Sequence, residues 1–297
     1  MMLFKILKLF LKKYSLFLAF VFLFALSPHF ALANFSCKNI LENNTSFQSN
    51  LIKLNDLLGH SFDEKGTFIS PLDVNYLAKH GVIQPEMNSL SKLLAQIYNS
   101  LRAFANKVDD ALKDRDTEIQ VAQNFRYAWT ESASPVYDSA VISMIQLSKI
   151  LNLKPNQSFV DMGSGLGFPV AILSVLNPNS NFTGYEFMSA KVDGAQQLID
   201  SFNIKNAEFI RSDFAATDFD PVVADVYYFY YPSSYEAMQA ASEKIVEANR
   251  GRTIRVVGYR YLDQSLMAFK RMGYEDSITL EGPEGPFEVL TLQIDAN

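Results

Sequence analysis

The chain has very little of the chemistry that cysteine and histidine provide. It contains one cysteine, Cys37, and three histidines among 297 residues. A single thiol excludes both an intrachain disulfide and a zinc site built from several thiolates. Beyond residue 33 the histidines are His60 and His80, and neither lies in a metal-binding spacing such as H-E-x-x-H. No histidine follows His80, which also argues against a hydrolase triad of the α/β-hydrolase order.

An excess of positive charge is missing as well. The chain has 26 Lys and Arg against 32 Asp and Glu, and its formal net charge is −6. Since phosphate binding depends on clustered Lys and Arg, this balance argues against nucleic acid as a partner. It favours a basic partner, such as a lysine-bearing protein segment. An apolar content of 48% with 20% charged residues is ordinary for globular proteins and excludes disordered and fibrous classes.

Residues 1–33 have the pattern of a targeting segment. A basic stretch ends at Lys13, an apolar run follows at 14–26, and Ala31 and Ala33 form an A-x-A exit. This pattern predicts a Sec-type signal peptide and an exported body, either periplasmic or secreted. The alternative is a signal anchor formed by residues 14–26, although a membrane span needs about 20 residues. Membrane contact is expected only through this segment. The remainder of the chain is expected to lie outside the cytoplasm.

The remainder divides into a helical N-terminal region, 34–134, and an α/β domain, 135–297. In the first, a short helix is expected at about 47–58, and apolar residues at three- and four-residue steps predict an amphipathic helix from Pro85 to Leu112. In the second, a helix at about 135–151 precedes the sheet. Apolar strands then alternate with helices, which predicts a parallel sheet covered on both faces.

The expected strands and helices define a Rossmann-like fold. Strands are predicted at 158–162, 181–186, 207–211, 224–230 and 253–259, and helices at 167–176, 189–203, 233–249 and 263–272. The end of the chain reads as two strands joined by a Gly/Pro turn at 282–286. We therefore expect a seven-stranded, mostly parallel sheet that ends in an antiparallel hairpin.

Chemically informative residues follow successive strands. The first strand leads into Asp161 and a run of small residues, the second ends at Glu186, and the third is followed by Asp213. The carboxyl ends of parallel strands form one edge where ligands bind. A glycine-rich turn lets the backbone approach a ligand, and an acid ending the second strand suits the two hydroxyls of a ribose. The run of small residues comprises Gly163, Ser164, Gly165 and Gly167.

A nicotinamide dinucleotide is the competing ligand. The spacing here is G-x-G-x-G, and Phe168 takes the place of the last glycine of G-x-G-x-x-G. Asp161 would also repel a pyrophosphate. A ligand that carries an ammonium and a sulfonium would instead be attracted by this carboxylate.

The motif FVDMGSGLG, together with the acids at the next two strand ends and the final hairpin, resembles the class I S-adenosylmethionine-dependent methyltransferases. The resemblance covers about 135–297. It implies that Asp161 and the glycine-rich backbone hold the methionine part of S-adenosylmethionine. It further implies that Glu186 binds the ribose, that Asp213 faces the adenine amine, and that Phe214 lies beside the adenine ring.

A narrower resemblance concerns SASPVYDSAVISMIQLSKI and VDMGSGLGFPVAIL. Both are similar to the non-SET, seven-β-strand protein-lysine methyltransferases, in which the segment before the sheet caps the cofactor. That implies capping roles for Thr130, Pro135 and Tyr137. The fourth strand ends in Tyr230-Tyr231-Pro232 and lacks the Asp or Asn of the amino-methyltransferase pattern.

The acceptor is expected at the end of this fourth strand. Tyr227 to Phe229 are predicted to lie in the core, whereas Tyr230 and Tyr231 should line the acceptor site. Aromatic walls attract and desolvate a lysine, which lowers the pKa of its amine and favours attack on a methyl group. We therefore expect methyl transfer to a protein lysine. The alternatives are a small-molecule or lipid methyltransferase and a cofactor-binding module without turnover.

Overall fold

The computed structural model describes residues 47–56, 97, 137–214, 216–230, 235–259, 266–282 and 285–296, with backbone alone at 137–140 and 190. Residues Met1–Glu42 group as one unit and Asn43–Asn297 as another, and every described residue belongs to the second. The predicted targeting segment lies outside the described residues, as does the predicted helix of 85–112 apart from Ile97.

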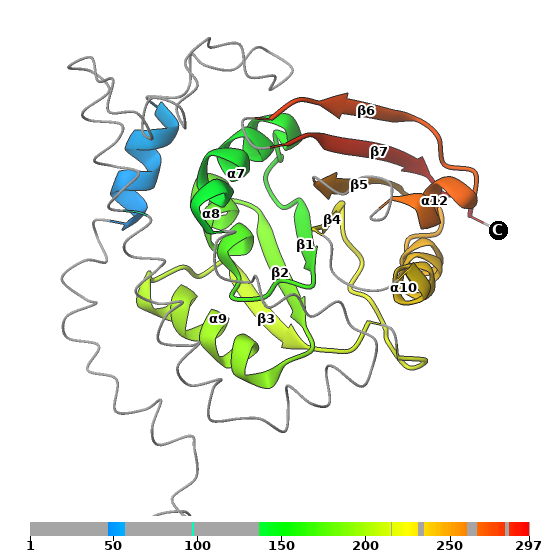
Figure 1. The fold of residues 1–297 in the computed structure, drawn as a ribbon, viewed down its shortest axis with the longest axis horizontal. Coiled ribbons are helices and arrows are strands. Elements are labelled where there is room, and N and C mark those ends of the chain that lie inside the picture. The colour runs from blue at the N-terminus through cyan, green and yellow to red at the C-terminus, as the bar shows by residue number, and fades with distance from the viewer. Residues whose placement is uncertain are drawn as a thin grey trace, which may run out of the picture. The chain divides into compact units, whose positions relative to one another are not determined.

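Seven strands form one sheet in the order β3-β2-β1-β4-β5-β7-β6 (Figure 1). Strands β1 to β5 pair in parallel, and β7 is antiparallel to both β5 and β6. This confirms the predicted Rossmann-like, mostly parallel sheet with a C-terminal antiparallel hairpin. The strands are β1 Ser158–Met162, β2 Asn181–Glu186, β3 Ala207–Arg211, β4 Val226–Phe229, β5 Thr253–Tyr259, β6 Ser277–Leu280 and β7 Phe287–Gln293.

Helices cover both faces of the sheet (Figure 1). One face, called here the α8 face, packs against α7 (Tyr137–Leu151), α8 (Phe168–Leu176) and α9 (Ser189–Ser201). The other, the α10 face, packs against α10 (Tyr235–Ala248) and α12 (Met267–Arg271). Two separate clusters of buried apolar side chains fill these interfaces, as expected for a sheet that is covered on both faces.

Side chains of the central strand β4 alternate between the two faces. Val226 and Tyr228 belong to the cluster on the α8 face, and Tyr227 and Phe229 to the cluster on the α10 face. All four are buried. The prediction that Tyr227 to Phe229 form core is confirmed. By the same alternation Tyr230, the next residue, packs on the α8 face.

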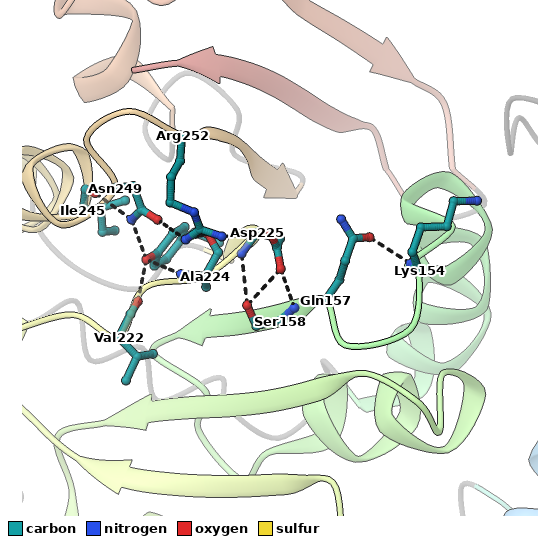
Figure 2. A network of polar contacts seen from close by, with 10 residues as sticks. Lys154, Gln157, Ser158, Val222, Ala224, Asp225, Ile245, Asn249 and Arg252 are labelled. Carbon is teal, nitrogen blue, oxygen red and sulfur yellow. Dashed lines mark hydrogen bonds and ion pairs between the residues drawn. The ribbon is translucent and has the colours of Figure 1, made fainter. Parts of the chain in front are cut away.

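A polar network ties together the strands' amino ends (Figure 2). The Asp225 carboxylate accepts hydrogen bonds from the backbone N–H and the hydroxyl of Ser158, at 2.8 and 3.1 Å, and pairs with Arg252 at 3.0 Å. Arg252 also donates to Asn249 at 2.8 Å, and Asn249 donates to the Tyr227 hydroxyl at 2.8 Å. The network fixes β1, β4 and β5 at the edge opposite the glycine-rich turn, so its role is structural.

The start of one strand differs from the sequence prediction. Strand β4 starts at Val226 rather than at residue 224, because the Ala224 N–H donates to the Tyr227 hydroxyl at 3.1 Å instead of entering the sheet. Between β3 and β4 the described residues, 212–214 and 216–225, form turns and irregular backbone without a helix. Strands β1, β2, β3 and β5 have the predicted bounds.

A helix over residues 47–56 joins the core of the α8 face. The Phe47 ring stacks on Phe202, just after α9, with centroids 4.0 Å apart and planes 5° apart. The Gln48 side-chain amide donates to the Phe202 carbonyl at 2.5 Å, and Leu51 and Leu54 are fully buried. The predicted domain boundary at residue 135 stays a prediction. Within the described ranges, no helix has the length and apolar character needed to cross a membrane.

Candidate functional site

The glycine-rich turn after β1 adopts backbone angles that favour glycine. Gly163, Gly165 and Gly167 have φ values of 87°, 55° and 75°, all in the left-handed region. The N–H groups of Gly163 and Ser164 donate to the Tyr185 carbonyl at 3.0 and 2.8 Å, which ties the turn to the end of β2. A Cβ atom at Gly165 would meet no atom of the other described residues within 4 Å, its two chain neighbours aside. The turn is therefore rigid and offers open space at Gly165.

Asp161 lies beside this turn near the end of β1, and its side chain is 2% exposed. Its Oδ2 atom has no hydrogen-bond partner within the described part of the chain, and neither does the buried Ser164 Oγ. Burial raises the pKa of Asp161 to about 8, and the negative charge of Glu186 adds to the increase. A carboxyl so placed carries its proton at neutral pH and would ionise beside a cation.

Glu186 ends β2 and holds the turn from the other side. Its Oε2 accepts a hydrogen bond from the Gly165 N–H at 2.9 Å, and its Oε1 accepts one from the Met188 N–H at 2.9 Å. The side chain is 8% exposed. These two bonds fix the plane of the carboxylate, and each oxygen retains a lone pair for a further donor.

The segment after β3 carries Asp213, partly buried, and Phe214, buried. Phe214 packs edge-on against Phe219, with centroids 6.5 Å apart. Phe219 in turn packs edge-on against Tyr185 of β2, at 5.2 Å. The Lys244 ammonium of α10 donates to the carbonyls of residues 216 and 217 at 2.7 and 2.6 Å. This segment is thus held against β2 and α10. It lies two strands away from the glycine-rich turn in the strand order.

Other predicted site residues are only partly covered. Tyr230 is partly exposed and lies beside Tyr259, with ring centroids 5.2 Å apart. Thr130, Pro135 and Tyr231 lie outside the described residues, and Tyr137 is described by its backbone alone, as the first residue of α7. The structure therefore brings Asp161, the glycine-rich turn and Glu186 together, and their roles toward a ligand stay predictions. Across the described ranges, no three His, Cys, Asp or Glu side chains gather as a metal site.

Residues 153–260 match a family model described as a methyltransferase domain. The chain contains a methyltransferase domain. Its sheet and helices have the class I fold of enzymes that depend on S-adenosylmethionine, and that compound is the cofactor of this class.

The curated relatives share one name, ribosomal RNA small subunit methyltransferase G. The protein from Flavobacterium johnsoniae is 26% identical over 123 residues, which cover 36% of this chain and 59% of that protein. The one from Prochlorococcus marinus is 34% identical over 80 residues, which cover 27% of this chain and 32% of that protein. The chain thus spans between about a third and three fifths of the length of these relatives.

Solved structures resemble the methyltransferase domain distantly. A SAM-dependent methyltransferase from Aquifex aeolicus has a TM-score of 0.43 at 13% identity, covering 52% of this chain and 92% of that one. The assignment of the fold rests on the strand order and not on this likeness.

These relatives correct one expectation from the sequence. Nucleic acid was predicted to be a poor partner because the chain is acidic, and the relatives' shared name, which refers to ribosomal RNA, contradicts that prediction. The physical reason is that net charge is a sum over the whole chain. Binding of a nucleic acid depends on the local surface and on ring stacking with bases, which the sum does not register.

The methyltransferase domain has features that fit S-adenosylmethionine. The cofactor bears an ammonium and a sulfonium. Asp161 places a buried carboxyl oxygen, without a hydrogen-bond partner among the residues described, at the edge where these charges would lie. The open space at Gly165 permits a close approach to the backbone. Glu186 and the segment at 213–214 lie one and two strands further along the same edge, in the order an adenosine needs.

Sequence reasoning missed several residues that shape this site. Lys244 and Phe219 fix the segment that carries Asp213 and Phe214, yet Lys244 is one of many charges on an amphipathic helix, and no local pattern marks its target. Ser143 of α7 shares a buried hydrogen bond of 2.8 Å with Tyr259. The two residues are 116 positions apart, and only the tertiary structure brings them together.

Proposed function

We propose that this chain is an S-adenosylmethionine-dependent methyltransferase whose acceptor is ribosomal RNA. The observation that carries the cofactor assignment is the buried Asp161 carboxyl, whose Oδ2 lacks a partner among the described residues beside the open space at Gly165. The acceptor is proposed from the name of the relatives, since the matched segment covers only part of each of them.

Each cofactor-binding residue has a distinct task in this proposal. Asp161 pairs with the cationic methionine part, and Glu186, oriented by the N–H groups of Gly165 and Met188, accepts from the ribose hydroxyls. Asp213 accepts from the adenine amine, and Phe214 borders the adenine. When bound, S-adenosylmethionine supplies an electrophilic methyl group. The chain's own contribution is to position the acceptor in line with it, which can provide much of the rate enhancement.

Other acceptors and other roles can be distinguished from this proposal by experiment. The protein-lysine acceptor expected from the sequence has no support in the names of the relatives. A small-molecule or lipid acceptor and a module that binds without turnover are the further alternatives. Export of the body, expected from residues 1–33, is a separate proposal, and N-terminal sequencing of the protein isolated from cells tests it.

The test combines binding with methyl transfer. Calorimetry of the full chain should give a micromolar dissociation constant for S-adenosylmethionine, and Asp161→Asn and Glu186→Gln should each weaken it by tenfold or more. That is the size expected from the loss of a charged hydrogen bond, about 1.5–3 kcal/mol. Glu247→Gln is the matched control, because Glu247 is exposed on α10 and pairs only with Arg250 among the described residues. Its affinity should not change.

The acceptor is tested with a labelled methyl group. Small-subunit ribosomal RNA, free and in assembled subunits, is taken from bacteria that lack their own methyltransferase G. Label in RNA supports the proposal. Label in protein or in an organic extract would mean that the acceptor belongs to another class, while the cofactor assignment would stand. A folded chain that does not bind S-adenosylmethionine would overturn the assignment as a whole.

A further inference from the structure

Three aromatic rings form a row along the carboxyl edge of the sheet, from β4 to β7. Tyr230 follows β4, Tyr259 ends β5 and Phe287 begins β7. The Tyr230 and Tyr259 centroids are 5.2 Å apart at 44°, and the Tyr259 and Phe287 centroids are 4.4 Å apart at 21°. Because β7 is antiparallel to β5, its first residue lies at the same edge as the last residue of β5. These three rings are called the aromatic row below.

One end of the aromatic row is fixed and the other is accessible. Tyr259 is 3% exposed and Phe287 is fully buried. The Tyr259 hydroxyl also shares a buried hydrogen bond with Ser143 of α7, at 2.8 Å. Tyr230 alone in the row is partly exposed. Tyr259 thus supports the Tyr230 ring, and Phe287 supports Tyr259. The Tyr230 ring can therefore act as a stacking surface with little loss of side-chain entropy.

The accessible end of the row adjoins the cofactor site. In the pairing of β1 with β4, Met162 lies opposite Phe229, so Tyr230 follows at the level of Gly163. Two residues earlier, Tyr228 pairs with Asp161. Tyr228 and Tyr230 pack on the α8 face, and by strand alternation Asp161 points to that face as well. A flat acceptor on Tyr230 would therefore lie next to the turn expected to hold the methyl donor.

We propose that Tyr230, backed by Tyr259 and Phe287, stacks on the base that receives the methyl group. The inference rests on the proposed function and deepens it, because it names how an RNA acceptor is held. Every base has a π face, so stacking on an aromatic ring holds an unpaired base whatever its sequence context.

The test replaces the ring and leaves the position otherwise filled. In the full chain, Tyr230→Leu should lower kcat/KM for small-subunit ribosomal RNA by about 5- to 150-fold, the range for loss of one base–aromatic stack. Tyr230→Phe keeps the ring and should stay within about twofold of the native chain. RNA affinity of the cofactor-free chain should fall with Leu and not with Phe. If Leu lowers the melting temperature, Tyr230→Gln is the second variant without a ring.

Other results would overturn the inference. An RNA-methylating chain whose Leu variant matches it would show that Tyr230 does not hold the acceptor, while the proposed function would stand. Equal loss in Phe and Leu would assign the effect to the hydroxyl and not to stacking. Parallel loss of S-adenosylmethionine affinity would make Tyr230 a cofactor contact. If the native chain labels a lysine peptide and not RNA, the proposed acceptor is wrong, and the base-stacking role with it.

Discussion

At the scale of single residues, Asp161 predicts that cofactor binding depends on pH. Without ligand its carboxyl keeps a proton up to about pH 8, because burial and then Glu186 raise its pKa. A bound ammonium or sulfonium favours the ionised form, so binding expels this proton. The dissociation constant for S-adenosylmethionine should fall by about tenfold per pH unit between roughly pH 6 and 7.5. Above about pH 8 the ligand's own α-amino group loses its charge and affinity should fall again.

Calorimetry at pH 7 in two buffers of different ionisation enthalpy measures the expelled proton directly. Asp161→Asn is the control, and its weaker binding should not vary over the same pH range. The pH dependence of folding stability has the opposite sign to that of cofactor affinity. The unfolded carboxyl ionises near 3.8 and the folded one near 8, so the ligand-free chain should lose stability as pH rises through this window. Asp161→Asn should abolish that loss. A native chain with flat affinity from pH 6 to 7.5 would contradict the prediction.

At the scale of the element, a methyl group added in the glycine-rich turn should weaken ligand binding, and one added in β2 should destabilise the fold by overpacking. Gly165→Ala places its Cβ where, in the described part of the chain, no residue beyond its two neighbours lies within 4 Å. At φ 55° the fold should therefore lose only about 1–2 kcal/mol of backbone energy. The same methyl would occupy the open space at this turn, and S-adenosylmethionine affinity should fall tenfold or more. In Gly184→Ala the Cβ would lie 2.5 Å from Phe209 Cδ1 and 2.7 Å from Ser164 Oγ. Overpacking of this kind costs about 1–3 kcal/mol of folding free energy.

Thermal melting and calorimetry on both variants separate the two effects. Gly273→Ala is the matched control for Gly165→Ala. Gly273 also has a positive φ, 92°, and an added Cβ there would meet no described residue within 4 Å apart from its chain neighbours, but Gly273 follows α12. It should show a similar loss of stability with unchanged affinity. Equal affinity in the Gly165 and Gly273 variants would mean that the cofactor does not approach the turn at Gly165.

At the scale of the whole molecule, the sequence predicts periodic features well and long-range partners poorly. Strands β1, β2, β3 and β5 are short runs with apolar and aromatic residues between turn residues, so their bounds follow from local pattern. The glycine motif and the acids at strand ends are equally local. The support of Tyr259 by Ser143 and the anchoring of the 216–217 carbonyls by Lys244 depend on which surfaces meet, which no spacing encodes. The prediction that nucleic acid is a poor partner was wrong because net charge does not say where charges lie on the surface.

The contact between Phe47 and Phe202 leads to a prediction about the whole molecule. Phe47 is 1% exposed, and its ring lies flat on a residue at the end of α9. Phe47→Ala should therefore cost about 3–5 kcal/mol, as for other buried phenylalanines. Because the helix of 47–56 shares the core of the α8 face, the loss should lower the melting temperature of the methyltransferase domain itself, by about 2–4 °C per kcal/mol.

Ile52→Ala on the same helix is the control, because Ile52 is 47% exposed, and its effect should stay within about 0.5 kcal/mol. Circular dichroism of the full chain reports the transition, and hydrogen exchange locates it. Faster exchange in α9 and β2 together with the helix would mean that residues before 137 stabilise the sheet that carries Glu186. S-adenosylmethionine would then raise the melting temperature of the Phe47 variant, since it binds only the folded state. Loss of protection confined to 47–56 would instead make this helix an independent appendage.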